Sequence, residues 1–379
     1  MAYFCEGFTR LISVRRWADF SAATGGFLTS SNIGDVFSSV AGREMGGGIG
    51  LDDNNGNTVQ ETLAASFSNI GGSNSESSMQ CQLSFKFERP SSTPTNYMPG
   101  TQELISFPGA LGILPFQSTG DAASSPSNSR RFRISLRQWD SSAGAFTGSS
   151  AFNDNLYLST WYTAIFRVEV TAGVSAQYEL KIYRQGDFVS PVLDQSGTVT
   201  FADASNPFLC RIGVQENQSV DDWVIKTGSD VDAFSSLPTP VVVDSLLTSA
   251  NGTTIQWTPS NAGDNYTNVD DVGADLDSDQ VAATTSGQVD LYRTTGTTAQ
   301  IPTGADIEGV TAHGIGLSPD GLSIKVKMRP ASTTVDVGTN QTLTTGDTTF
   351  ARGSATNPDG GGAWTKALLD ATEFGIELV

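Results

Sequence analysis

The side chains that could perform chemistry in this sequence are few and scattered. The only histidine, His313, lies in the stretch Thr311–Ile315 without the partners that a hydrolytic triad or a zinc site needs. The sequence contains no Gly-x-Ser-x-Gly, His-Glu-x-x-His or Cys-x-x-Cys motif. His313 is therefore interpreted as a structural residue. No catalytic, cofactor-binding or metal-ligating residue is assigned, and no cofactor is expected.

Paired carboxylates are the second kind of chemistry considered. Glycosidases of sandwich fold place two acids close together, often two residues apart on one strand. Glu169 and Glu179 lie on expected strands, but neither has a second acid two residues further on. The sequence therefore favours a protein that is not an enzyme. A polysaccharide hydrolase or lyase remains the alternative of another class.

The densest acidic run, between Asp264 and Asp279, could hold calcium. Its aspartates are Asp264, Asp270, Asp271, Asp275, Asp277 and Asp279. An EF-hand loop also needs glycine at position 6 and glutamate at position 12, and here those positions hold Gln280 and Ser286. The run is interpreted as a solvated acidic loop, and calcium binding is left open.

Other residues could contact a ligand through their side chains or backbone. Trp139, Trp161 and Tyr183 could stack on sugar rings, but each is interpreted as a core or interface residue. The run Gly46–Leu51 lacks the Lys-Ser/Thr that follows a phosphate-binding loop, so it predicts a flexible strand.

One expected strand, Arg131–Trp139, has a basic face in an otherwise acidic protein. Arg131, Arg133 and Arg137 alternate there with Phe132, Ile134 and Leu136. This face is interpreted as a solvated sheet face with cross-strand ion pairs. A surface for an anionic partner is the alternative.

The elements that would position these residues are β-strands. Trp161–Val170 alternates strictly, with Tyr162, Ala164, Phe166, Val168 and Val170 on one face, and Tyr178–Tyr183 repeats the pattern. Period-two apolarity with Gly and Asp between the runs is typical of antiparallel strands that cover a core. Further strands are expected at Met79–Phe87, Glu103–Phe107, Phe208–Val214, Val241–Val243, Thr254–Trp257, Gly287–Tyr292, Val310–Leu317, Ser323–Arg329 and Phe374–Leu378, with one short helix at Trp364–Ala371.

Length and charge indicate two units. The 379 residues exceed an ordinary single domain. Residues 236–240, with two prolines and no periodic pattern, predict a linker between a unit at 1–235 and a smaller unit at 241–379. The net charge of −19 divides into −8 before residue 239 and −11 from there on. An acidic balance disfavours nucleic acid as a partner, because phosphates are bound by clustered Lys and Arg.

Cysteine usage and hydropathy exclude two further classes. Cys5, Cys81 and Cys210 are odd in number and widely spaced, so buried free thiols are expected rather than a disulfide framework. No run of about 18 apolar residues is present, so membrane insertion is not expected. Arg10, Arg15 and Arg16 interrupt the start, which does not resemble a signal peptide.

Several short sequence segments, in their order along the chain, resemble those of a known family. Phe4–Phe8, Phe85–Phe87, Trp161–Tyr162 and Asp221–Ile225 look like a concanavalin A-like (laminin-G-like) jelly roll. Over nearly the whole chain, the sequence is similar to virion structural proteins of tailed bacteriophages, in which a second β-domain follows. The sequence segments that match this second β-domain are Asp244–Leu247, Gln256–Ser260, Tyr266–Asp270, Gly287–Tyr292, Ala363–Thr365 and Glu373–Glu377.

The resemblance implies a non-enzymatic protein located in the virion. Its fold is expected to be all-β, a concanavalin A-like jelly-roll sandwich plus a smaller C-terminal β-sandwich. Within that class we favour a tail-associated or fibre-like protein that contacts host-surface glycans. A capsid decoration protein is the alternative. The expected partners are other virion proteins and further copies of the chain, for example in a trimer, without nucleic acid or membrane insertion.

Overall fold

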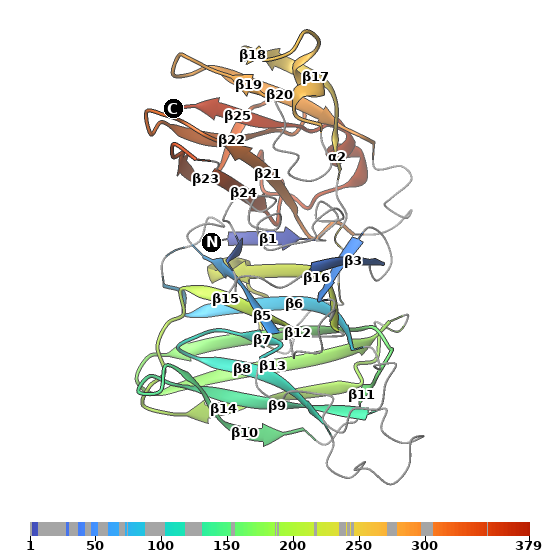
Figure 1. Ribbon diagram of the computed structural model, residues 1–379, viewed down its shortest axis with the longest axis vertical. Coiled ribbons are helices and arrows are strands. Elements are labelled where there is room, and N and C mark those ends of the chain that lie inside the picture. The colour runs from blue at the N-terminus through green and yellow to red at the C-terminus, as the bar shows by residue number, and fades with distance from the viewer. Residues whose placement is uncertain are drawn as a thin grey trace.

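The computed structural model describes residues 2–6, 28–29, 37–41, 47–51, 60–67, 73, 75–87, 103–117, 131–152, 156–185, 187, 189–215, 218–234, 240, 243, 246–270, 279–296, 306–346 and 348–379. Within these ranges most residues lie in β-strands. Two stacked sheets form a jelly-roll sandwich, and a smaller β unit follows in sequence (Figure 1). The expected all-β fold, a jelly-roll sandwich plus a smaller β-sandwich, is confirmed.

The described strands of the sandwich are antiparallel throughout. The first sheet contains, in spatial order, β14 (Leu193–Thr200), β13 (Ser175–Arg184), β12 (Tyr162–Thr171), β6 (Ser78–Phe87), β16 (Gln218–Thr227), β4 (Gly47–Leu51) and β3 (Phe37–Ala41), and β1 (Ala2–Glu6) also pairs with β16. The second contains β10 (Ala145–Ala151), β9 (Arg131–Asp140), β8 (Leu111–Gln117), β7 (Ile105–Ser106), β15 (Leu209–Gln215), β5 (Gln60–Ser66) and β2 (Leu28–Thr29), and β11 (Leu156–Tyr157) also pairs with β9.

The jelly-roll core fills the space between these sheets, and aromatic rings interlock across it. Phe85 and Phe87 of β6 lie edge-on to Phe132 of β9, with ring centroids 6.3 and 5.1 Å away. Trp223 of β16 is fully buried. Cys81 and Cys210 are buried free thiols, as expected for these two. The inward face predicted for β12, from Tyr162 to Val170, is the one that contributes to this core.

The C-terminal unit is built on a five-stranded sheet. Its strands are, in order, β17 (Thr248–Ile255), β20 (Val289–Thr294), β25 (Glu373–Leu378), β22 (Ser323–Arg329) and β23 (Val335–Thr342), with the separate pairs β18 (Thr258–Pro259) with β19 (Val281–Ala282) and β21 (Val310–Gly316) with β24 (Thr348–Ser354). Met328 of β22 and Phe350 of β24 meet in its core. The short helices are η3 (Gly228–Asp230), η4 (Asn265–Asn268) and α2 (Lys366–Ala371). Thr365 caps α2 by accepting a hydrogen bond from the Leu368 N–H, as its side chain favours.

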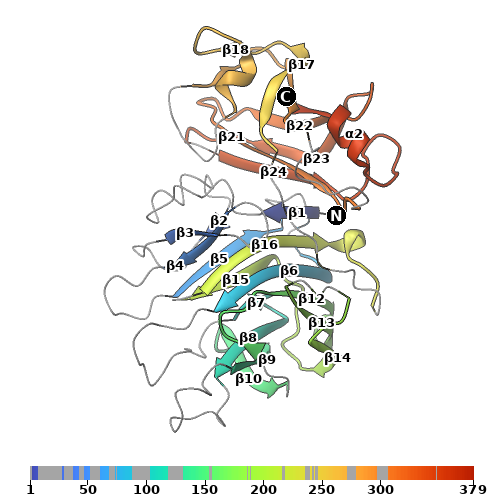
Figure 2. The same ribbon diagram turned by 90° about the vertical axis from the view of Figure 1, so that its right-hand side faces the viewer.

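The strand β1 joins the two units. The pairing of β16 with β6 shifts its register between Asp221 and Val224. On the other edge of β16, β4 pairs with residues 219–220 before the shift, and β1 pairs with residues 223–227 after it. On its other side β1 contacts β21 and β24. Figures 1 and 2 both show it between the jelly roll and the C-terminal strands. Val224 and Val243 form a further buried contact here, against Ala355.

Some expected boundaries differ from the structure or fall outside the described residues. The strand predicted at Thr254–Trp257 is β17, which ends at Ile255 because the next two N–H groups donate to the Asp290 carboxylate instead of a strand. Of the predicted strand Val241–Val243 only Val243 is described, and it is not in a strand. Of the predicted linker only Pro240 is described, so the division into 1–235 and 241–379 stays a prediction.

Candidate functional site

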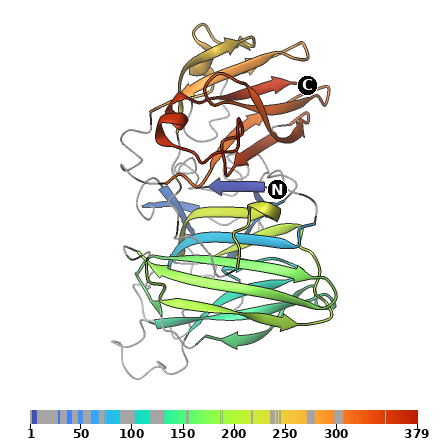
Figure 3. The same cartoon turned by 180° about the vertical axis from the view of Figure 1, so that it is seen from behind.

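The outward face of the first sheet gathers charged side chains. Residues of β12 that alternate with the core point outward, and the strand register places Arg167 opposite Glu179 of β13 and Gln80 of β6. Glu169 and Glu179, the two acids noted in the sequence, both interact electrostatically with Arg167. In Figure 3 the green strands β12, β13 and β14 carry this sheet through the lower half of the molecule. The fold therefore brings these two acids together around one arginine.

Arg167 is buried although it is charged. Its side chain is 7% exposed, and its guanidinium carbon lies 3.7 Å from the centroid of the Phe234 ring. Nη2 lies 3.4 Å from a Glu169 carboxylate oxygen, whereas Nε and Nη1 have no hydrogen-bond partner. Burial lowers the pKa of Arg167, and Glu169, Glu179 and Asp232 oppose this effect. The stacked ring takes the place of solvent above the guanidinium.

The segment that follows β16 closes this face. A carboxylate oxygen of Asp232 accepts hydrogen bonds from Gln80 Nε2 at 2.8 Å and Lys226 Nζ at 3.0 Å. The Asp232 N–H donates to Gln80 Oε1 at 3.2 Å. Lys226 Nζ also lies 3.9 Å from Glu308, which belongs to the C-terminal unit. The chain's own residues thus occupy the groups that a ligand on this face would use.

The two acids on this face pair with cations but differ in exposure, because the Glu169 side chain is 51% exposed. Glu179 is 4% exposed, and one of its oxygens lies 3.4 Å from Lys181 Nζ. Burial raises the pKa of Tyr183, so its hydroxyl stays protonated at neutral pH. The aromatic residues considered for sugar stacking are half-buried or buried, as interpreted: Trp139, Trp161 and Tyr183. The arrangement can tie strands together.

A buried aspartate marks the register shift in β16. Asp222 is 1% exposed and has a φ of 49°, which is unusual for a residue other than glycine. Its carboxylate accepts hydrogen bonds from the Ser84 hydroxyl at 2.7 Å and from the Val243 N–H at 2.9 Å. It therefore ties the jelly roll to the segment that leads into the C-terminal unit.

The basic strand β9 is largely engaged in contacts within the chain. Arg131 lies over the Tyr157 ring, 5.2 Å from its centroid. Arg137 lies 3.8 Å from a Glu103 carboxylate oxygen and donates to the Phe146 carbonyl. Burial raises the pKa of Glu103, and Arg137 opposes this shift. The ion pair of Arg137 is with Glu103, which precedes β7 (Ile105–Ser106), so it is not the cross-strand pair expected from the sequence.

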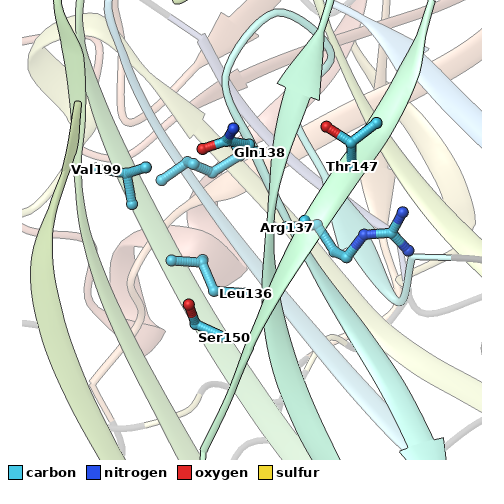
Figure 4. A pocket seen from close by; sticks show the side chains of 8 residues that line it. Leu136, Arg137, Gln138, Thr147, Ser150 and Val199 are labelled. Carbon is cyan, nitrogen blue, oxygen red and sulfur yellow. The ribbon is translucent and has the colours of Figure 1, made fainter. Parts of the chain in front are cut away.

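A shallow cleft of about 150 Å³ opens where one edge of each sheet lies beside the other (Figure 4). Val199 of β14 faces Leu136 and Gln138 of β9 across it, and Thr147 and Ser150 of β10 complete the rim. The register of β10 against β9 shifts between Thr147 and Ser150. This bulge interrupts the ladder at the edge and leaves the cleft open to solvent.

The other sequence candidates do not form a site within the described residues. No group of three or more His, Cys, Asp or Glu side chains that could hold a metal ion occurs there. Asp264 accepts from Asn251 and Asp279 from Asn261, whereas Asp271, Asp275 and Asp277 lie outside the described residues. His313 is exposed on β21, and Gly47–Leu51 forms β4 as expected. No described helix has the length and hydropathy to cross a membrane.

Two of the buried carboxylates that the sequence analysis did not single out accept several hydrogen bonds. They are Asp222 and Asp290, the latter fully buried. Asp290 accepts from the N–H groups of Gln256 and Trp257, from Asn265 Nδ2 and from the Tyr292 hydroxyl, at 2.6 to 2.8 Å. A signal was present for Asp290, since Asp290 sits inside an expected strand between apolar neighbours.

Known proteins were compared with the chain by sequence and by structure. No protein-family model and no curated sequence matches it. It is similar to the marine PL-14 alginate lyase from Aplysia kurodai, with 13% identity and a TM-score of 0.33 over 60% of this chain and 100% of that chain. It is also similar to the catalytic domain of a glycoside hydrolase family 131 protein from Coprinopsis cinerea, with 12% identity and a TM-score of 0.24 over 59% of this chain and 78% of that one.

A third similar structure is the CBM2 module of the evolved Dit of Lactobacillus casei BL23 phage J-1. The identity is 12% and the TM-score 0.25, over 59% of this chain and 89% of that chain. The solved structures named here are all-β jelly-roll sandwich proteins. The jelly-roll assignment of this chain rests on its own two stacked sheets.

Proposed function

We propose that this chain is a non-enzymatic structural protein of a tailed bacteriophage particle, tail-associated or fibre-like, that contacts glycans on the host surface. The observation that carries the proposal is the junction between the two β units. Strand β1 pairs with β16 and contacts β21 and β24, and the Asp222–Val243 hydrogen bond and the Lys226–Glu308 pair lie beside it. A connection through strand pairing and buried polar contacts suits a part that transmits load within an assembly.

The paired state of the charged groups supports the non-enzymatic part of the proposal. On the outward face of the first sheet, Arg167 lies beneath Phe234, and Asp232 holds Gln80 and Lys226. Glu179 is buried beside Lys181, and the exposed Glu169 carboxylate pairs with Arg167. The similar phage module and the sequence resemblance to virion proteins agree with the particle assignment without establishing it.

The decisive experiment is to locate the chain in an intact particle. We expect antibody raised against the purified chain to label the tail or its fibres by electron microscopy. Labelling over the head would support the capsid decoration alternative and contradict the tail assignment. Failure to find the chain in purified particles by mass spectrometry would contradict the virion assignment itself.

A second experiment tests the enzyme alternative. We expect the wild-type chain to release neither reducing ends nor unsaturated products from host polysaccharide. The variants Glu169→Gln and Glu179→Gln should be indistinguishable from wild type. Product release that is lost in either variant would contradict the proposal and assign the acids around Arg167 to catalysis.

A further inference from the structure

We propose that the cleft between β9, β10 and β14 binds one neutral monosaccharide unit at the end of a glycan chain. This inference rests on the proposed glycan contact and specifies where on the chain it occurs. The size of the cleft sets the limit of one unit. A cavity of about 150 Å³ accommodates a six-membered ring such as benzene, and the cleft has about this volume. A longer saccharide would extend from the cleft into solvent.

The floor of the cleft is apolar. Leu111 and Leu136 of the second sheet and Val199 of β14 contribute to its lining, and both leucines are buried. One face of a pyranose ring presents mainly C–H groups, which pack on apolar side chains. Binding sites for small ligands combine such a floor with a few polar groups that fix the orientation.

The polar groups of the rim are available to a ligand. Gln138, Thr147 and Ser150 line the cleft, and their side chains form no hydrogen bond within the part of the chain that the structure describes. An amide and two hydroxyl groups supply donors and acceptors at once, which matches the hydroxyl groups of a sugar. In Figure 4 Gln138 and Ser150 lie on the same side of β9 as Val199, around the opening.

The lining predicts a neutral ligand rather than an acidic or basic one. Arg137 is the charged residue that lines the cleft. Its guanidinium pairs with Glu103 and the Phe146 carbonyl, and Figure 4 shows its side chain directed away from Val199. A uronate or sialate carboxylate would enter without a free cation to pair with, in a chain whose net charge is −19. A basic sugar would lack a carboxylate partner.

The backbone holds the rim in place. Gly148 has a φ of 63° at the bulge, a conformation that glycine adopts without steric cost. Residues on both sides of the bulge, Thr147 and Ser150, remain paired with β9. The backbone of both rim residues is therefore fixed relative to β9 before a ligand arrives, which reduces the entropy lost on binding.

Saturation-transfer NMR on the full chain tests the cleft. The probes are the methyl glycosides of glucose, galactose, mannose and N-acetylglucosamine, with sodium glucuronate as the acidic comparison. We expect at least one neutral glycoside to receive saturation, and glucuronate to receive none. Ser150→Trp should abolish the signal by filling the opening. Gln138→Ala should weaken binding about fivefold, as for one lost hydrogen bond.

The matched control is Thr198→Trp, because Thr198 is exposed on β14 next to Val199 but alternates to the other side of the strand. It should bind as wild type does. No signal with any neutral glycoside, an equal signal in Ser150→Trp, or preference for glucuronate would each overturn the inference. If Ser150→Trp still binds host cells as wild type does, the cleft is excluded while glycan contact by the chain stands.

Discussion

The two β units of this protein are stabilised by different means. In the jelly roll, rings from both sheets interlock: Phe85 contacts Phe87, Phe132 and Tyr162 in one buried cluster. The C-terminal unit has a smaller buried cluster around Met328 and Phe350. Both units contain buried carboxylates, such as Asp222 in the jelly roll, but in the C-terminal unit Asp290 and Glu373 connect strands that the small core covers less completely.

The difference follows from how much apolar area each unit can bury. Two stacked eight-stranded sheets enclose enough side chains for area burial to dominate, at about 25 cal/mol per Å². A five-stranded sheet with the β21–β24 pair packed against it encloses fewer side chains. Carboxylates that accept several hydrogen bonds then fix strand positions, but removing one leaves its donors buried and unpaired.

The largest effect should come from the aromatic core. We expect Phe85→Ala to lower the free energy of unfolding by about 3–5 kcal/mol, because the cavity it leaves is bounded by rings from both sheets that cannot collapse into it. Urea unfolding followed by intrinsic fluorescence measures this. Phe208→Ala is the matched control, since that ring is 52% exposed, and it should change stability by less than about 1 kcal/mol. Equal effects of the two would contradict the role given to the core.

A smaller, local effect is expected in the C-terminal unit. Asp290→Ala removes the acceptor of two N–H groups, the Asn265 amide and the Tyr292 hydroxyl, at a cost of about 3 kcal/mol. Hydrogen exchange should accelerate in β17, β20 and η4 and stay unchanged in β12 and β13. Asp320→Ala, at an exposed turn, is the control. Uniform acceleration in both units would mean that the units do not differ as described.

Alternation in the sequence predicted several of the strands that cover a core. The bounds of β22 were predicted as Ser323–Arg329, and the two faces of β12 were assigned correctly. Edge strands were missed, for example β14 (Leu193–Thr200) and β23 (Val335–Thr342), because one side of an edge strand faces solvent and its residues need not be apolar. The interior strand β8 (Leu111–Gln117) was missed as well, because its buried residues form an apolar run instead of an alternation.

The sites depend on contacts that a local pattern does not contain. The cleft brings Val199 beside Ser150 through the stacking of two sheets, and its opening depends on a bulge. Asp222 receives its hydrogen bonds from residues 138 positions earlier and 21 positions later in the chain. The closure of the outward face by Phe234 also required the structure, since no periodicity marks that segment.

The smallest effect is the acid sensitivity of Glu373, which sharpens the contrast between the units. Burial raises its pKa, but hydrogen bonds from Thr253 and the nearby Arg293 and Arg329 outweigh this, so the pKa lies below its ordinary value. A lowered pKa stabilises the fold above the ordinary value of about 4.3. That stabilisation is lost as the pH falls through the lower, folded-state pKa.

We therefore expect the unfolding free energy of wild type to fall more steeply than that of Glu373→Gln between about pH 5 and about pH 3. Over this interval the wild type should lose about 1 kcal/mol more than the variant. The glutamine cannot titrate, so the difference between the two curves isolates this one group from the other carboxylates. Urea unfolding at each pH measures it, and hydrogen exchange should place the loss in β17 and β25. Parallel curves would show that the negative charge of Glu373 does not stabilise the fold. The difference in stabilisation between the two units would then rest on Asp290.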